Sequence, residues 1–121
     1  MSNFNNAHMK LDKWESQIKK GTLEFVILLV LANEECYGYE LIKKIKKSVD
    51  IETAEGTIYP ILNRLKKAGY VSSRWEHPDT GIPRKYYGIT KSGKSALEEM
   101  KQSWKTFTES ITRMIRKNDV G

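Results

Sequence analysis

The residues with the clearest chemical use lie close together, between positions 57 and 67. The hydrogen-bond donors there, two of which are positively charged, are Thr57, Tyr59, Asn63, Arg64 and Lys67. Donors of this kind suit phosphate oxygens and the edges of nucleic-acid bases. This stretch therefore indicates a surface that binds a nucleic acid.

A helix is predicted to hold these side chains on one face. The apolar residues of the same stretch recur at steps of three and four, and they are Ile58, Ile61, Leu62 and Leu65. This spacing predicts one buried stripe along a helix of roughly three to four turns. The hydrogen-bonding residues then belong to the other, exposed face.

Local signals predict where this helix begins, bends and ends. Thr53 is the predicted N-cap, and Gly69 is the predicted left-handed residue after the last turn. Pro60 lies inside the pattern and has no N–H to donate to the carbonyl of Gly56. We therefore expect the first turn to be bent or displaced from the rest of the helix.

The charge balance favours an anionic partner without identifying it. The chain has 121 residues, with 21 basic and 15 acidic side chains and a formal charge of +6. A merely soluble basic protein has the same balance. A chain of this length forms one domain and lies near the size at which a second subunit often completes the core, so we expect a dimer.

Cysteine usage and hydropathy predict a cytoplasmic protein that does not contact a membrane. Cys36 is the only cysteine, so no internal disulfide can form and a reducing compartment is expected. The longest apolar run, from Phe25 to Ala32, falls far short of the roughly 20 residues that cross a bilayer. No signal-peptide pattern is visible between Met1 and Lys20.

Catalytic patterns are missing from the sequence. His8 and His77 lie in polar segments, and no Cys-His or carboxylate pair has the spacing of a catalytic motif. There is no glycine-rich phosphate loop and no cluster with metal-ligand spacing. The sequence predicts neither an enzyme nor a metal or cofactor site.

The first 21 residues are predicted to hold a mobile arm and one helix. The arm covers Met1 to Ala7, which has little to bury. From His8 to about Gly21, apolar residues at helical steps predict a short amphipathic helix, and they are Leu11, Trp14 and Ile18. This helix packs either on its own domain or on the last helix of a partner subunit.

Two further helices are predicted before the one described above. The first, from Leu23 to Asn33 with Thr22 as its cap, is apolar on all sides, and its length favours a central buried helix over a strand. The second, from Gly38 to Ser48, exposes Lys43, Lys44, Lys46 and Lys47. These lysines form either a solvated face or the place where the first helix of a helix-turn-helix crosses the DNA backbone.

A β-hairpin is predicted to follow. The segments 71–76 and 84–89 alternate in polarity and flank a stretch rich in turn formers. Arg84 and Lys85 follow the tip, where they either enter a minor groove and clamp phosphates or serve as edge charges that discourage sheet aggregation. Helices followed by a basic helix and a hairpin predict a winged helix-turn-helix.

The last segment, from a cap at Thr90 or Ser92 to about Arg116, is predicted to be one long helix. Its apolar residues have the spacing of a coiled-coil seam, and they are Leu97, Met100, Trp104, Phe107, Ile111 and Met114. We expect this helix to pair with a second copy, which places two recognition helices about one DNA turn apart. Packing back on the first helices is the alternative.

Three blocks together resemble the PadR-type transcriptional regulators. They are Tyr37-Gly38-Tyr39-Glu40-Leu41, then Glu55-Gly56-Thr57-Ile58-Tyr59-Pro60-Ile61-Leu62-Asn63-Arg64-Leu65 with Gly69-Tyr70-Val71, then Arg84-Lys85-Tyr86-Tyr87-Gly88-Ile89-Thr90-Lys91-Ser92-Gly93. The similarity covers roughly Gly21 to the end of the chain. It implies a mainly α protein with a small β-hairpin: an arm and short helix in 1–20, a winged helix-turn-helix in 21–90 and a dimerisation helix in 91–121.

The resemblance also implies a function. It is that of a repressor which binds a pseudo-palindromic operator in double-stranded DNA as a homodimer. The predicted DNA-binding residues are Tyr39, Lys43, Thr57, Tyr59, Asn63, Arg64, Lys67, Arg84 and Lys85. Of these, Tyr39 is expected at a phosphate, with an ordinary half-buried tyrosine as the alternative.

A small-molecule effector is implied by the shorter branch of the family, which includes multidrug-sensing members. By this resemblance, Trp104 of this chain, with Phe107 one turn on, is expected to stack on a planar aromatic ligand. Simple core packing is the alternative. The alternative function for the whole chain is a winged-helix module that binds another protein without sequence-specific DNA binding.

Overall fold

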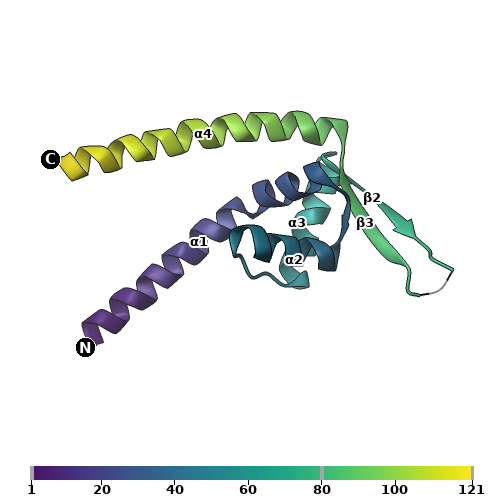
Figure 1. Ribbon diagram of the computed structural model, residues 1–121, viewed down its shortest axis with the longest axis horizontal. Helices are drawn as coiled ribbons and strands as arrows, with labels where there is room; N and C mark the ends of the chain where they lie inside the picture. The colour runs from purple at the N-terminus through teal and green to yellow at the C-terminus, as the bar shows by residue number, and fades with distance from the viewer. Residues whose placement is uncertain (1, 80, 121) are drawn as a thin grey trace.

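The computed structural model describes the backbone of residues 2–79 and 81–120 and the side chains of residues 11–79 and 81–120. Its elements are α1 (Ser2–Asn33), β1 (Cys36–Tyr37), α2 (Gly38–Val49), α3 (Glu55–Lys67), β2 (Val71–Glu76), β3 (Arg84–Ile89) and α4 (Lys91–Val120). Figure 1 shows α2 and α3 gathered beside the C-terminal part of α1, with the free ends of α1 and α4 projecting together to one side. The predicted fold class, mainly α with a small β-hairpin and a long last helix, is confirmed. Among the residues described, no helix is long and apolar enough to span a bilayer.

The C-terminal part of α1 forms the centre of the core. Its buried apolar residues include Leu23, Ile27, Leu28 and Leu31. This part of α1 packs against α2, α4 and β3, which together surround it. A helix that is apolar on all sides needs neighbours on all sides, so the predicted central helix is confirmed.

The first helix is longer than predicted. We expected a mobile arm, a short helix to about Gly21 and a new helix capped by Thr22, but α1 runs without a break from Ser2. Gly21 does not have a positive φ, and the Thr22 hydroxyl donates to the carbonyl of Lys19 at 3.0 Å instead of capping a helix. Met1 and the side chain of His8 lie outside the described residues.

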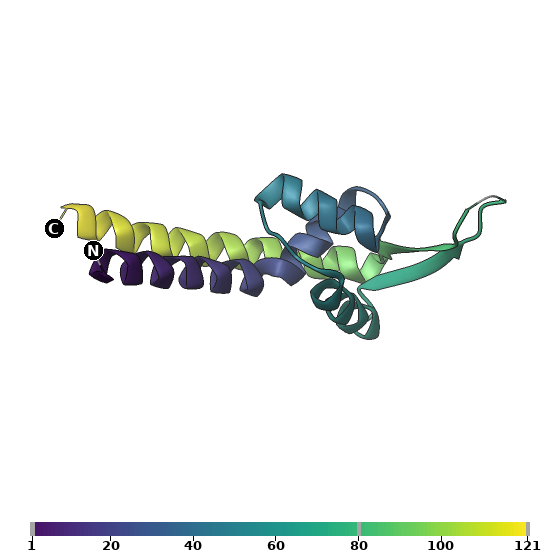
Figure 2. The same cartoon turned by 90° about the horizontal axis from the view of Figure 1, so that it is seen from below.

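The hairpin has its predicted bounds but belongs to a three-stranded sheet. The strand order is β1-β3-β2, and both pairings are antiparallel. The short strand β1 places Cys36 opposite Tyr87 and Tyr37 opposite Tyr86. Two residues cannot show the alternation that marks a strand, which is why β1 was not predicted. Figure 2 shows the hairpin leaving the body at the end opposite the two termini.

α3 is one continuous helix that contains Pro60 without a break. We expected a first turn that is bent or displaced. It is not displaced, since the N–H of Ile58 donates to the carbonyl of Ala54 at 3.0 Å. The predicted N-cap Thr53 is wrong, since the N-cap is Ala54 and the buried Thr53 hydroxyl has no hydrogen-bond partner. The predicted left-handed Gly69 is confirmed by its φ of 83°.

α4 starts at a cap that the sequence predicted. The Thr90 hydroxyl accepts a hydrogen bond from the N–H of Gly93 at 2.9 Å. Gly93 permits a close approach here, because a Cβ on it would lie 2.1 Å from the carbonyl oxygen of Tyr70. The helix extends to Val120, beyond the predicted end near Arg116.

Only part of the predicted seam on α4 is exposed in a single chain. Leu97 is 2% exposed and packs in the chain's own core, so its assignment to a dimer seam is wrong. Met100 is partly buried against the same core. The remaining seam residues are exposed, and they are Trp104, Phe107, Ile111 and Met114.

Candidate nucleic-acid interface

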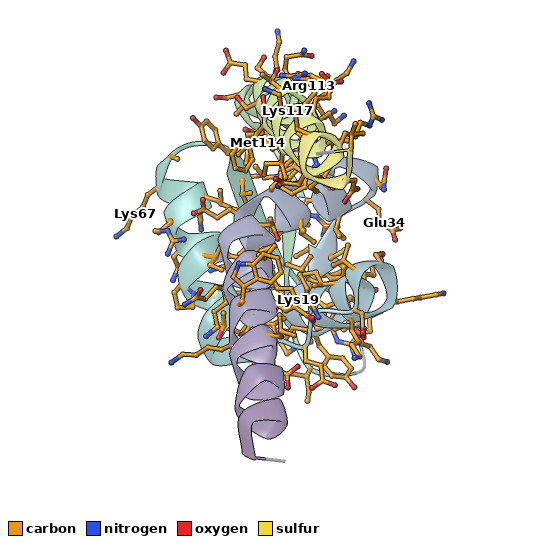
Figure 3. The ribbon with its side chains drawn as sticks, turned by 90° about the vertical axis from the view of Figure 1, so that its left-hand side faces the viewer. Lys19, Glu34, Lys67, Arg113, Met114 and Lys117 are labelled. Atoms are coloured by element: carbon orange, nitrogen blue, oxygen red, sulfur yellow. The ribbon has the colours of Figure 1, made fainter. Side chains whose placement is uncertain are left out.

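The exposed face of α3 has a central stripe opposite its buried stripe. Residues at steps of four, three and four share one face of a helix, and here they are Gly56, Pro60, Asn63 and Lys67. All four are exposed. Figure 3 shows Lys67 pointing away from the body. Two predicted DNA contacts, Asn63 and Lys67, therefore lie in the middle of this face.

Arg64 and Thr57 lie on the flank of α3 that faces α1. They are seven residues apart and so share one side of the helix. The carboxylate of Glu24 accepts hydrogen bonds from Arg64, at 2.7 Å from Nη2 and 3.2 Å from Nε. Both side chains are exposed, so the pair lies in solvent at the edge of the α3 face. The guanidinium is thus held toward α1 and away from the central stripe.

Tyr59 lies on the opposite flank and contributes to the fold as well as to the surface. A Cβ on Gly38 would lie 2.3 Å from the Tyr59 hydroxyl oxygen, so Tyr59 rests directly on the first residue of α2. Its ring centroid is 6.5 Å from that of Tyr87 in β3. Burial raises the pKa of Tyr87, and the charge of a nearby ionised Tyr59 raises it further. Tyr59 therefore joins α2, α3 and the sheet.

The two predicted cations of the wing are Arg84 and Lys85. Their side chains point to opposite faces of β3, because successive strand residues alternate. The Lys85 ammonium lies 5.9 Å from the ring of Trp75, its register partner, and 5.8 Å from the ring of Tyr87. The Arg84 guanidinium lies 4.6 Å from the ring of Tyr37. An aromatic ring attracts a cation that lies over its face. Each of the two cations therefore has a preferred position on the wing.

A hollow of about 360 Å³ lies where the starts of α2 and α3 meet the wing. It brings together four of the predicted DNA-binding residues, which are Tyr39, Tyr59, Arg84 and Lys85. Trp75 also lines it and is exposed, although the sequence analysis did not assign it a role. Cations and aromatic rings around a concave surface suit a sugar-phosphate backbone. The sequence signal that could have identified Trp75 is its position opposite Lys85 in the hairpin.

The lysines of α2 are not equivalent. The Lys43 ammonium lies 4.9 Å from the ring of Tyr39, beside the hollow. Lys44 and Lys46 instead form ion pairs with acidic residues of their own chain, including Glu34 for Lys44. Hydrogen bonds to these carboxylates raise the pKa of both ammonium groups. Of these three lysines, Lys43 is the one whose charge is directed to the candidate interface.

A second and more apolar hollow, of about 490 Å³, lies where α1 and α4 meet. Its walls include Thr22, Phe25, Met100, Trp104 and Phe107. The ring centroids of Phe25 and Trp104 are 5.8 Å apart, with the rings tilted by 44°. Figure 1 shows α1 and α4 diverging from this region toward the termini. The predicted effector residues Trp104 and Phe107 thus lie together, beside an aromatic residue of α1 that the sequence analysis had not assigned to a ligand.

The comparisons of this chain with protein families and with solved structures agree with one another. The family described as "Transcriptional regulator PadR-like family" matches residues 27–99 of the chain. A solved structure of a PadR-like transcriptional regulator from Bacillus cereus is similar, with a TM-score of 0.73 and 39% identity, covering 82% of this chain and 96% of that chain. A PadR family transcriptional regulator from Eggerthella lenta has a TM-score of 0.78 and 29% identity, covering 89% of this chain and 90% of that chain.

One named relative is much longer. The transcriptional regulator YqjI from Escherichia coli is 31% identical over 93 residues. The match covers 75% of this chain but 43% of that protein.

Proposed function

Because the chain belongs to the PadR-like family of transcriptional regulators, and not to a family of enzymes, we propose that it represses transcription as a homodimer on a pseudo-palindromic operator. The observation that carries the proposal is the outward stripe of α3 beside the cationic, aromatic hollow of the wing. α3 lies in the major groove in this proposal, with Asn63 at the base edges and Lys67 at phosphates. Arg84 and Lys85 hold the backbone beside the wing.

In the proposed complex, Arg64 contacts a phosphate and not a base. Its pairing with Glu24 holds the guanidinium on the flank of α3, away from Asn63 and Lys67. A side chain on the flank of a recognition helix meets the wall of the groove, where the phosphates are. We therefore assign Arg64 to a phosphate and Asn63 to a base.

The homodimer is supported by apolar side chains that one chain leaves uncovered. On α1 they are Leu11, Trp14 and Ile18, and on α4 they are Trp104, Phe107, Ile111 and Met114. Apolar residues at helical spacing on two projecting arms favour coverage by a second copy. Docking of α1 on the partner's α4 covers both sets at once and relates the two α3 helices by a two-fold axis.

An aromatic effector is proposed for the hollow between α1 and α4. Its volume of about 490 Å³ lies within the range of roughly 300–1,000 Å³ that is usual for small-molecule sites. Phe25, Trp104 and Phe107 offer ring faces to a planar compound. An effector that binds one arrangement of the two chains more tightly than another shifts the spacing of the two α3 helices and so changes operator affinity.

The first test is binding of the purified chain to the duplex upstream of its own coding sequence and to a scrambled duplex of equal length. We expect a preference for the first duplex that survives near-physiological salt. Weak binding that is equal on both duplexes and lost with salt contradicts the proposal, because phosphate attraction alone behaves in that way. A protein partner then becomes the better assignment. Sedimentation velocity on the same sample tests the homodimer.

Two variants separate base contacts from phosphate contacts. Asn63→Ala should cost about 1–3 kcal/mol on the operator and little on the scrambled duplex, whereas Lys67→Ala should weaken both by a similar factor. Lys117→Ala is the matched control, because it removes the same charge near the far end of α4. Equal losses for Asn63→Ala on both duplexes remove its base-reading role.

A further inference from the structure

Gly56 has no structural reason to be a glycine. It does not have a positive φ, and a Cβ built on it meets nothing within 4 Å. Gly38 and Gly93 differ, since a Cβ on either would strike a neighbour. A glycine within a helix costs roughly 0.5–1 kcal/mol relative to alanine. The chain therefore keeps a helix-weakening residue in α3 where its own packing would accept a methyl group.

Pro60 is the second unfavourable residue of α3, and it lies one turn after Gly56. Proline has no N–H, so the carbonyl of Gly56 lacks the partner that residue i+4 normally provides. The proline ring also crowds that carbonyl. Gly56 and Pro60 both lie on the exposed central stripe with Asn63 and Lys67. Pro60 thus leaves the Gly56 carbonyl without its usual partner, and glycine places no side chain beside that carbonyl.

We propose that the main-chain carbonyl of Gly56 reads a base pair of the operator, by accepting a hydrogen bond from the exocyclic amino group of cytosine or adenine in the major groove. This inference rests on the proposed function and deepens it. The absent side chain of Gly56 lets the backbone approach the base edge, and Pro60 keeps the carbonyl free for that contact. A backbone acceptor also loses no side-chain rotamer freedom on binding.

The chemistry of the carbonyl sets which bases it accepts. Cytosine N4 and adenine N6 are the amino donors of the major groove, whereas guanine O6 and thymine O4 are acceptors. A carbonyl that faces guanine or thymine leaves two acceptors opposed, which costs the hydrogen bond and its desolvation. We expect one position in each half-site to prefer cytosine or adenine by about three- to tenfold.

The test is selection from a randomised duplex library by the full chain, comparing the parent with Gly56→Ala and Pro60→Ala. Pro60→Ala restores an N–H to the Gly56 carbonyl, and Gly56→Ala holds the base away with a methyl group. Both variants should raise the thermal unfolding midpoint, because alanine is the better helix former. Gly21→Ala is the matched control, since it makes the same exchange in α1, where a Cβ also meets nothing within 4 Å.

The expected result is that both variants lose the cytosine or adenine preference at the same position while every other preferred position is kept. Gly21→Ala should select the parent's sequence. Unchanged preferences in both variants overturn the proposal. The proposal is also overturned if the parent prefers thymine at this position and only Pro60→Ala loses that preference. Such a result means that the proline ring packs on the thymine methyl group. If the parent selects no sequence at all, the proposed function itself fails, and the two failures are thereby distinguished.

Discussion

Replacing Glu24 with glutamine should strengthen binding to DNA. Glutamine keeps the size and one hydrogen-bonding oxygen of Glu24 but removes the charge that faces Arg64. In the proposed complex, Arg64 meets a phosphate from the flank of α3, and the Glu24 carboxylate lies next to that phosphate. The carboxylate attracts the guanidinium in the free protein and repels DNA in the complex. Both effects oppose binding.

The geometry of the pair sets the size of this effect. The carboxylate oxygen lies 2.7 Å from Nη2 of Arg64, and a phosphate hydrogen-bonded to the same guanidinium would lie roughly 6 Å from that carboxylate. Two like charges at about 6 Å in water repel by about 0.7 kcal/mol, which is roughly threefold in Kd. The stability of the free protein should fall by less than about 1 kcal/mol, because both side chains are exposed.

Fluorescence anisotropy with a labelled duplex at several salt concentrations measures this gain. Glu24→Gln should bind about threefold more tightly at low salt, on operator and scrambled DNA alike, and the gain should shrink as salt screens the charges. Glu98→Gln is the matched control, because it removes a carboxylate paired with Lys101 at 2.9 Å on α4. Weaker operator binding by Glu24→Gln would refute this reasoning and show that the carboxylate positions Arg64 for DNA.

Three more outcomes are expected. Gly38→Ala should cost about 1–3 kcal/mol in urea unfolding, because its methyl group meets the Tyr59 hydroxyl; an unchanged midpoint would mean that Tyr59 moves aside freely. Trp104→Ala should abolish binding of planar aromatic dyes, followed by dye fluorescence, with operator affinity kept, and loss of both would mark Trp104 as structural. Burial raises the pKa of the Cys36 thiol above its usual 9.0, so the unfolded chain releases this proton first. The free energy of unfolding should therefore fall as the pH rises above 9.0, and Cys36→Ala should flatten that decline; a parent profile that is already flat there contradicts this.

The elements that sequence predicted well are those decided by local signals. The hairpin strands 71–76 and 84–89 have their predicted bounds, because alternation and turn formers mark them without help from the rest of the chain. The helix from Gly38 was predicted to within a residue for a similar reason, since its apolar and lysine faces are clearly separated. Gly69 takes the left-handed conformation that ends α3, as its position indicated.

The errors occurred where tertiary packing decided between local alternatives. Gly21 and Thr22 look like the end of one helix and the cap of another, yet the buried residues that follow hold α1 as one helix across them. Thr53 has the chemistry of an N-cap, but burial takes its hydroxyl away from the start of α3. Leu97 continues the seam pattern of α4, and only the fold shows that α1 and its neighbours already cover it.

The candidate site was predicted by residue type but not by grouping. Donors and cations around α3 and the wing were assigned from their chemistry. Their sorting into a central stripe, a flank and a hollow depends on contacts between distant segments, such as Arg64 with Glu24 or Arg84 with Tyr37. Trp75 joined the site only because the register of β2 and β3 places it beside Lys85.

The two-residue strand β1 has a consequence for the order in which the chain folds. Helices α1, α2 and α3 follow one another through short connections, so their contacts close small loops at little entropic cost. The pairing of Cys36 with Tyr87 instead joins two segments separated by all of α2, α3 and β2. Such a long loop closes slowly. The two-residue pairing of β1 with β3 offsets little of the entropy lost on closing the loop until the hairpin has formed. We therefore expect the helical body to assemble first and β1 to join the sheet as a late step that fixes the wing to that body.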